Sequence, residues 1–260
     1  MSILQQIVND IQKDLVLKKQ IVPIESLESS PLFERQTNSL RQRVVETEGI
    51  IAEHKRRSPS KPNINFGLRL ADVAQGYESA GVAGMSVLTN NQYFGGSIED
   101  LLLARQACEL PLLRKEFMVD EYQVLEAKAN GADAILLIAA CLERPDIQIL
   151  STLAQQLGME VLLEIHNADE LKKSIMPSID MIGVNNRDLT SFRVSLKTSK
   201  SLVDQIPTEF VKLSESGLSS PESVLELRDC GYQGFLMGEY FMKTDDPGVS
   251  AQHFIKSLSK

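Results

Sequence analysis

Short apolar runs alternate with longer amphipathic stretches along most of the chain. Short runs rich in branched residues are typical of buried strands, whereas apolar residues spaced three or four apart are typical of helices. The apolar runs predict strands near residues 49–54, 84–89, 111–115, 133–138, 159–164, 180–184, 210–214 and 234–237. The stretches between them predict helices over residues 68–80, 98–108, 120–130, 145–157, 168–175, 195–205, 221–230 and 249–258.

The order of these elements indicates the fold class. Glycine follows four of the predicted helices, at Gly81, Gly131, Gly158 and Gly231, where it favours a left-handed cap. Eight strands that alternate with eight helices predict an α/β fold, a (β/α)8 TIM barrel. A doubly wound open sheet is the structural alternative, and it is disfavoured because no GxGxxG segment follows the first strand.

Residues 1–46 differ from the repeating pattern, which begins at Gly49. A stripe at helical spacing predicts a first helix and consists of Ile3, Leu4, Ile7, Val8, Ile11 and Leu15. A second short helix is expected over residues 39–45. Because a segment of this length cannot bury a core of its own, we expect an N-terminal helical extension over residues 1–46. The barrel catalytic domain is then expected over residues 47–260.

Several of the apolar runs stop at residues that can move a proton or hold an anion. These residues are Glu53 with Lys55, Lys115, Glu164, Asn185 and Glu215. A buried charge without a partner costs several kcal/mol, so a strand gains nothing from such an ending by itself. The carboxyl ends of barrel strands meet on one face, and we therefore expect these side chains to converge on one polar site.

The two-residue period of a strand predicts which of these side chains point inward. Glu53 and Lys55 share the inward face, as part of the site or as a structural ion pair, while His54 faces the helices as a packed histidine. Lys115 beside a carboxylate should stay protonated and could serve as a general acid. We expect burial at an apolar barrel mouth to raise the pKa of Glu164, which would suit a general base.

Small residues after three of the strands indicate a phosphate site. They form Ser58-Pro59-Ser60, Ser216-Gly217-Leu218-Ser219-Ser220 and Gly238-Glu239. Backbone N–H groups between small residues can approach an oxyanion, although ordinary turns are the alternative. Phe94 and Phe117 can line an apolar pocket, and Gly95-Gly96 is expected to be a turn. These residues predict a barrel enzyme that transfers protons on a small phosphorylated molecule.

Composition narrows the function classes. The chain has 260 residues and a net charge of −8, which disfavours a broad nucleic-acid surface. Its three cysteines lack a CxxC spacing, as expected for reduced thiols in a cytosolic protein. Its three histidines lack metal-ligand spacing, so no metal site is predicted. No apolar run approaches the roughly 18 residues of a membrane span, and no signal peptide is evident.

A series of ordered motifs runs through the predicted barrel. They are Ile51-Ala52-Glu53-His54-Lys55-Arg56-Arg57-Ser58-Pro59-Ser60, Ser86-Val87-Leu88-Thr89, Tyr93-Phe94-Gly95-Gly96-Ser97, Leu113-Arg114-Lys115-Glu116-Phe117, Val184-Asn185-Asn186-Arg187-Asp188-Leu189, Ser214-Glu215-Ser216-Gly217 and Leu236-Met237-Gly238-Glu239. In content, order and spacing this set resembles the indole-3-glycerol phosphate synthase family of tryptophan biosynthesis. The resemblance covers about residues 47–245, and the segment before it fits the family's N-terminal extension.

The resemblance implies a carbon–carbon lyase reaction for which no cofactor is expected. In this reaction 1-(2-carboxyphenylamino)-1-deoxyribulose 5-phosphate closes to indole-3-glycerol phosphate. An anthranilate ring carbon attacks the C2′ carbonyl, carbon dioxide leaves, and water is then eliminated. By analogy with the family, Lys115 is the general acid, and Lys55 holds the substrate carboxylate and donates a proton in the dehydration. Glu164 and Glu53 supply base and electrostatic roles.

The resemblance also implies which residues bind the substrate. Asn185, Arg187 and Glu215 would position it. The apolar positions that would flank the aromatic ring are Phe94, Phe117 and Leu136. The positions where the family binds phosphate are Ser58, Ser216, Gly217, Gly238 and Glu239. The extension would pack beside the barrel mouth and help to exclude water.

Some positions depart from the family pattern, and two other function classes stay open. His54 stands where the family more often has an apolar or small residue, and residues 240–243 are bulkier than usual. The alternatives are another phosphate-binding barrel enzyme, such as a sugar-phosphate isomerase or decarboxylase, and a non-catalytic barrel module. We expect a cytoplasmic monomer with a phosphorylated small-molecule substrate and no nucleic-acid or membrane partner; association with other tryptophan-pathway enzymes is left open.

Overall fold

The strands of the computed structural model, which describes residues 3–189 and 191–259, close into one parallel barrel. Each strand pairs with the next one in the chain, and the last returns to the first. The strands are β1 (Ile50–His54), β2 (Gly84–Leu88), β3 (Leu112–Lys115), β4 (Ala134–Ile138), β5 (Glu160–Ile165), β6 (Met181–Asn185), β7 (Val211–Glu215) and β8 (Gly234–Met237). Closure confirms the predicted (β/α)8 barrel and excludes the open sheet. Residues 1–2 and 260, which belong to the expected domain ranges, lie outside the described residues, as does residue 190.

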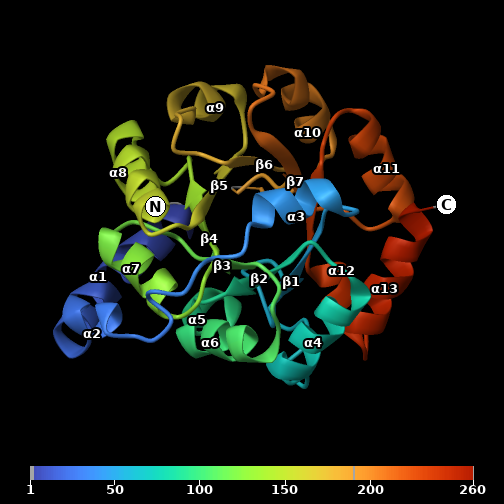
Figure 1. The fold of residues 1–260 in the computed structure, drawn as a ribbon. Coiled ribbons are helices and arrows are strands. Elements are labelled where there is room, and N and C mark those ends of the chain that lie inside the picture. The colour runs from blue at the N-terminus through green and yellow to red at the C-terminus, as the bar shows by residue number, and fades with distance from the viewer. Residues whose placement is uncertain (1–2, 190, 260) are drawn as a thin grey trace.

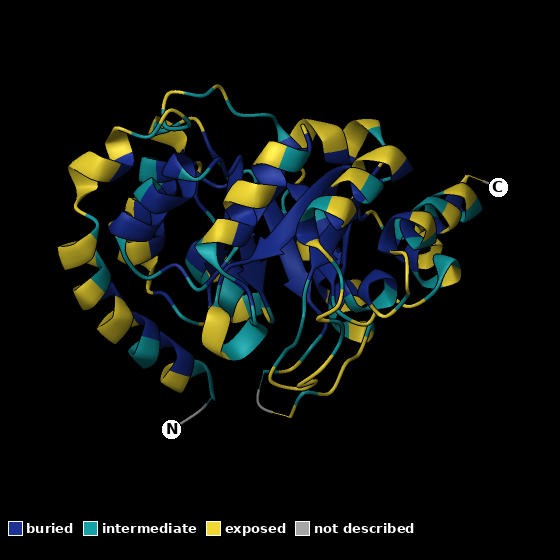
Figure 2. Ribbon diagram, turned by 90° about the horizontal axis from the view of Figure 1, so that it is seen from below, coloured by how far each residue is buried: buried dark blue, intermediate teal, exposed yellow. Residues whose placement is uncertain are grey.

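Helices surround the barrel in a ring (Figure 1). The ring consists of α4 (Leu70–Ala80), α6 (Ile98–Ala107), α7 (Glu121–Ala129), α8 (Arg144–Gln156), α9 (Ala168–Ser174), α10 (Lys197–Leu202) with the 3-10 helix η1 (Val203–Gln205), α11 (Pro221–Asp229) and α13 (Pro247–Leu258). The strands are buried at the centre, and the exposed residues lie on the outer faces of the helices (Figure 2). The predicted cap glycines Gly81, Gly131, Gly158 and Gly231 have φ values of 80°, 86°, 74° and 108°, which confirms the left-handed caps.

Two short helices at the carboxyl end of the barrel were not predicted from the sequence. They are α5 (Asn91–Phe94) and α12 (Glu239–Met242), which follow β2 and β8. The expected turn at Gly95-Gly96 begins with the left-handed cap of α5, since Gly95 has a φ of 69°. Both helices carry residues that face the cavity described below.

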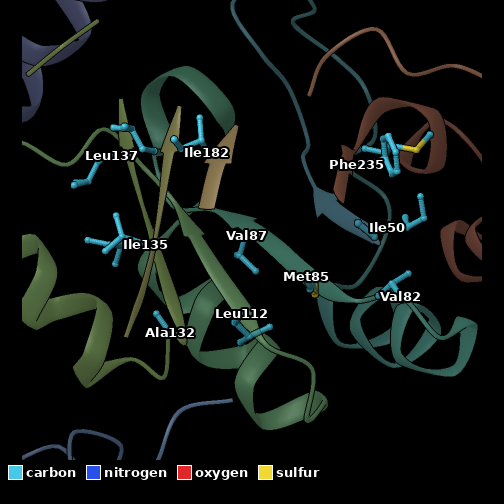
Figure 3. Packing of buried hydrophobic residues seen from close by; sticks show 14 of the residues in the cluster. Ile50, Val82, Met85, Val87, Leu112, Ala132, Ile135, Leu137, Ile182 and Phe235 are labelled. Carbon is cyan, nitrogen blue, oxygen red and sulfur yellow. The ribbon is translucent and has the colours of Figure 1, made fainter. Parts of the chain in front are cut away.

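Two apolar cores lie on opposite faces of the strands, because successive side chains of a strand point in opposite directions. The outer core, between strands and helices, includes Ile50, Val87, Ile135, Leu137 and Ile182 (Figure 3). The inner core, inside the barrel, includes Ile51, Leu113, Leu162, Met181 and Leu213. His54 shares its strand face with Ile50 and is only 1% exposed, in agreement with the predicted packing role.

The helix α3 (Leu40–Glu46) closes the amino-terminal end of the barrel and crosses it in Figure 1. Its side chains Leu40 and Val44 belong to the inner core. A Cβ atom on Gly84 would lie 2.4 Å from Leu40 Cδ1, and one on Gly234 would lie 3.0 Å from Val44 Cγ1. The glycines of β2 and β8 therefore make the space that α3 fills.

The earlier part of the extension packs on the outside of the barrel. The helix α1 (Ile3–Ile21) buries its apolar stripe with Leu27 of α2 (Ile24–Glu28) and with Tyr122 of α7. The extension thus has two parts with different neighbours. One part packs beside the ring of helices, and the other closes the amino-terminal end of the barrel with side chains that enter the inner core. The inner core includes side chains of both α3 and the strands, so it does not mark a boundary after residue 46. The expected domain boundary stays a prediction.

We predict that Leu40→Ala destabilises the barrel. The side chain is fully buried, and truncation of a buried leucine leaves a cavity that costs about 2–5 kcal/mol. Urea unfolding should show this loss, while Val45→Ala, at a position that is 55% exposed, should change the free energy of unfolding by about 0.5 kcal/mol or less. Equal stabilities of the two variants would show that α3 is not part of the core.

Candidate active site

The residues that were predicted to form a site all line one cavity at the carboxyl end of the barrel. The cavity has a volume of about 520 Å³. From the sequence prediction it includes Glu53, Lys55, Ser58, Phe94, Lys115, Phe117, Leu136, Glu164, Asn185, Arg187, Glu215, Ser216, Gly217, Gly238 and Glu239. Such a concave space with few charged groups on apolar walls is typical of a small-molecule site.

Lys115 is the centre of the charged part of the cavity. Its Nζ atom lies 3.0 Å from Glu164 Oε2 and 2.6 Å from Glu215 Oε2. Burial lowers the pKa of Lys115, but the negative charges of Glu164 and Glu215, with that of Glu53 behind them, outweigh it and leave the pKa raised. The ammonium group is therefore protonated at neutral pH, in the form that a general acid requires.

The two carboxylates that share Lys115 have different surroundings. Glu164 Oε1 accepts a hydrogen bond of 3.0 Å from Asn185 Nδ2, whereas Glu215 Oε1 is buried with no hydrogen-bond partner in the described part of the chain. Burial raises the pKa of Glu164, but the charges of Lys115 and then His166 bring it below its usual range. Burial, followed by the charge of Glu164, raises the pKa of Glu215.

This difference corrects one expectation. The sequence predicted a raised pKa for Glu164. In the folded protein this pKa is lowered, because the cations Lys115 and His166 lie beside the carboxylate and Asn185 donates a hydrogen bond to it. Glu215 carries the raised pKa instead. Pairs of acids whose surroundings separate their pKa values are typical of active sites that use both an acid and a base.

Glu53 and Lys55 form the second charged pair. Lys55 Nζ donates to Glu53 Oε1 at 2.7 Å, and Ser86 Oγ donates to Glu53 Oε2 at 3.2 Å. Burial raises the pKa of Glu53, but the charges of Lys55 and Lys115 outweigh it, so the pKa is lowered. A Cβ atom on Gly238 would come within 3.0 Å of Glu53 Cβ, so glycine at the end of β8 leaves space for this carboxylate.

Aromatic and aliphatic side chains form one wall of the cavity. The rings of Phe94 and Phe117 lie 6.2 Å apart between centroids, at an angle of 32°. Leu136 lies on the same lining, and α1 adds Ile3, Leu4 and Ile7. Tyr93 Oη donates to Asp10 Oδ2 at 2.7 Å and so ties α5 to α1. The extension thus reaches the cavity, as its predicted place beside the barrel mouth requires.

The loops after β1, β7 and β8 also line the cavity. Ser216 and Gly217 both have positive φ, of 69° and 79°. A Cβ atom on Gly217 would lie 2.3 Å from Val194 Cγ1, so this position needs glycine for contact as well as for conformation. Glu239 forms an ion pair with Lys61, which offsets its negative charge. Arg187 is held by its backbone N–H, which donates to Asn185 Oδ1 at 3.0 Å.

One charged neighbour of the site was not identified from the sequence. His166 follows β5, and its Nε2 atom lies 3.4 Å from Glu164 Oε1. Because it comes two residues after Glu164, strand alternation could have indicated that both side chains share a face. Burial lowers the pKa of His166, but its bond with Glu170 and the charge of Glu164 leave the pKa raised.

Residues 3–189 and 191–259 contain neither of two other kinds of feature. No group of three or more histidine, cysteine, aspartate or glutamate side chains in these ranges could hold a metal ion. Over the same ranges, no helix combines the length and the apolar character needed to cross a membrane.

The family pattern and the related sequences give one family. The sequence pattern of the family described as indole-3-glycerol phosphate synthase matches residues 4–256. A protein of that name from Bacteroides thetaiotaomicron is 44% identical over 258 residues, which are 99% of either chain. One from Dechloromonas aromatica is 48% identical over 200 residues, covering 77% of this chain and 76% of the other. A solved structure of 3-hexulose-6-phosphate synthase from Salmonella typhimurium has a TM-score of 0.64 at 11% identity, covering 81% of this chain and 98% of that one, and supports the fold alone.

Proposed function

The chain belongs to the indole-3-glycerol phosphate synthase family, and on this premise we propose that its barrel cavity closes 1-(2-carboxyphenylamino)-1-deoxyribulose 5-phosphate to indole-3-glycerol phosphate. Carbon dioxide and water are the other products, which makes the protein a carboxy-lyase of tryptophan biosynthesis. The observation that supports this most is the protonated Lys115 between two carboxylates, opposite an apolar wall. Ring closure needs both an acid and a place for an aromatic ring.

The first step joins the aromatic ring to the carbonyl carbon. Phe94, Phe117 and Leu136 offer the apolar surface on which the anthranilate ring can lie. In this orientation Lys115 protonates the carbonyl oxygen as the ring carbon attacks. The fixed carboxylates around Lys115 keep its ammonium group charged until that moment, so the proton is present where negative charge develops.

The next steps release carbon dioxide and water. Lys55, which is 21% exposed and paired with Glu53, can hold the substrate carboxylate until carbon dioxide leaves. In the dehydration Lys55 can donate the proton with which the hydroxyl leaves as water, and Glu164, whose lowered pKa keeps it ionised, can take the proton lost from the neighbouring carbon. Asn185 fixes Glu164 by a direct hydrogen bond, and Glu215 lines the cavity, where it can help to position the substrate.

The phosphate group fits the part of the cavity that the loops after β1, β7 and β8 line. Ser58, Ser216, Gly217 and Gly238 present backbone and hydroxyl groups there, and Arg187 adds a cation to the lining. Glu239 would repel a phosphate by itself, and its ion pair with Lys61 reduces that repulsion. The expectation of a monomer stays a prediction. Cytoplasmic location and any association with other pathway enzymes stay predictions.

Formation of an indole from the carboxyphenylamino substrate tests the proposal directly. The chain contains no tryptophan, so indole fluorescence that grows during the reaction comes from the product. A pure preparation without this signal would overturn the proposed function. Turnover of a sugar phosphate instead would favour another phosphate-binding barrel enzyme, and substrate binding without turnover would favour a non-catalytic module.

We predict that Lys115→Met lowers kcat by roughly 10²-fold or more, because it removes the general acid. Circular dichroism should show a folded barrel. Lys172→Met, at an exposed position on α9, is the matched control and should keep full activity. Turnover of the Lys115 variant within about threefold of the wild type would contradict the assignment.

We predict that Gly217→Ala raises KM about tenfold or more, which corresponds to ~1.4 kcal/mol of binding free energy. The new methyl group would collide with Val194 and move the loop after β7 away from the phosphate. Gly81→Ala is the control, since Gly81 has a φ of 80° but no heavy atom within 4 Å of the added Cβ. Both variants should be less stable, and an equal KM for both would remove this loop from the phosphate site.

We predict that Ile7→Ala raises KM while Leu15→Ala does not. Both residues are buried in the contact between α1 and α7, so both changes should lower the melting temperature. Only Ile7 also lines the cavity, where its loss admits water beside the substrate. A chain that begins at Val22 should fold and show the same rise in KM. If it keeps the full-length KM, α1 does not shape the site.

A further inference from the structure

His166 lies between two carboxylates at the edge of the active site. Its Nδ1 atom is 3.1 Å from Glu170 Oε2, and its Nε2 atom is 3.4 Å from Glu164 Oε1. Glu170 Oε2 also accepts the backbone N–H of His166 at 2.7 Å, and Asn167 Nδ2 donates to Glu170 Oε1 at 2.8 Å. The imidazole ring is therefore fixed from the side of α9, with its Nε2 atom beside Glu164.

The contacts of the ring determine how many protons it carries. Burial raises the pKa of Glu170, but its bond with His166 and the charge of His166 bring the pKa below its usual range, so Glu170 is ionised and only accepts. Nδ1 must then carry a hydrogen. Nε2 is buried and has no hydrogen-bond partner among residues 3–189 and 191–259. Nε2 nevertheless lies 3.4 Å from the oxygen of an ionised Glu164, close enough for an electrostatic attraction that favours a protonated ring although the two atoms form no hydrogen bond. The geometry thus favours the doubly protonated imidazolium.

The other charged groups near His166 are on four elements. Glu164 ends β5, Glu170 lies on α9, and the charge of Glu215 at the end of β7 also acts on the ring. Lys115 on β3 reaches His166 only through Glu164, to which it is bound. Cys141 lies near Glu164 and Glu170, and burial followed by these charges raises its pKa to about 12, so it is a neutral thiol.

Lys115 alone does not decide which of its two carboxylates is ionised. It lies closer to Glu215, at 2.6 Å, than to Glu164, at 3.0 Å. What distinguishes the two acids is the second oxygen: Glu164 Oε1 faces Asn185 and His166, and Glu215 Oε1 faces no donor among the described residues. Asn185 is neutral, so the charge added beside Glu164 Oε1 is that of the imidazolium, which forms an ion pair with Glu164 but acts on Glu215 only over a longer distance.

We propose that His166, held by Glu170, is a positioning residue that makes Glu164 rather than Glu215 the ionised carboxylate beside Lys115. This inference rests on the proposed function, in which Glu164 is the base of the dehydration step. His166 does not line the cavity and acts only through Glu164. An ionised Glu164 can take a proton from the substrate, while Glu215 can remain protonated.

The pH dependence of turnover tests the proposal. His166→Gln removes the charge but keeps an N–H donor, so the pKa of Glu164 should rise. The acidic limb of kcat should move to higher pH by at least about half a unit, with KM within about twofold. Glu170→Gln should move the limb in the same direction by less. The double variant should match His166→Gln alone, because Glu170 acts through His166.

Two outcomes of this experiment would overturn the proposal. One is an acidic limb of His166→Gln at the wild-type pH, and the other is an effect of Glu170→Gln that adds fully to that of His166→Gln. His253→Gln, at an exposed position on α13, is the control and should leave the limb unchanged. A wild-type protein that forms no indole would contradict the proposed function. If the wild type is active and the acidic limb of His166→Gln does not move, only the role of His166 is contradicted.

Histidine NMR tests the same coupling without turnover. The chain has only three histidines, so their titrations can be assigned by single substitutions. Coupling is reciprocal, and an imidazolium that stabilises ionised Glu164 must itself be stabilised by it. Glu164→Gln should therefore lower the pKa of His166 by at least about half a unit, and Glu215→Gln should lower it less. An unchanged His166 titration in Glu164→Gln would overturn the proposal.

Discussion

The buried ammonium group of Lys115 constrains the whole carboxyl end of the barrel. Its two direct carboxylate partners come from β5 and β7, and the pair Glu53–Lys55 follows from β1. All four strands are odd-numbered, as the layered interior of a closed barrel requires, since alternate strands contribute to the same layer. A buried charge is tolerated only with partners in good geometry, so the register of these strands must be kept for the cluster to exist.

The even-numbered strands accommodate this cluster because they carry glycine beside the large charged side chains of the odd-numbered strands. A Cβ atom on Gly183 of β6 would lie 2.9 Å from Glu215 Oε1, and one on Gly238 after β8 would lie 3.0 Å from Glu53 Oε1. At the opposite end, Gly84 and Gly234 make space for Leu40 and Val44 of α3. An apolar helix therefore closes the amino-terminal end of the barrel, and charged side chains line the carboxyl end. Glycine makes the space that is needed at both ends.

The strands, the ring of helices and the gathering of the candidate residues around one cavity followed from the sequence, because each rests on local periodicity and on the convergence of strand ends. Leu40 could not be placed, since a helical stripe shows that a face is buried but not which core it enters. The short helix at Asn91–Phe94 is too brief for a periodic signal. The ionisation of Glu164 depends on Asn185 and His166, which meet it only in the closed barrel. The assigned chemical roles come from the resemblance and stay predictions.

The opposite pKa shifts of Glu164 and Glu215 separate the pH ranges in which the two acids act on stability. Glu164 has a lowered pKa in the folded protein, so its contribution to stability is present above its unfolded pKa and lost as the pH falls. Glu215 has a raised pKa, so its contribution is present below its unfolded pKa and lost as the pH rises through the folded value. The Glu164 contribution changes between its folded pKa of about 2 and the ordinary range of a glutamate, and the Glu215 contribution changes between that range and its folded pKa of about 7. The two acids therefore act on stability in separate pH windows, and Glu164, the proposed base, stays ionised throughout the window in which Glu215 titrates.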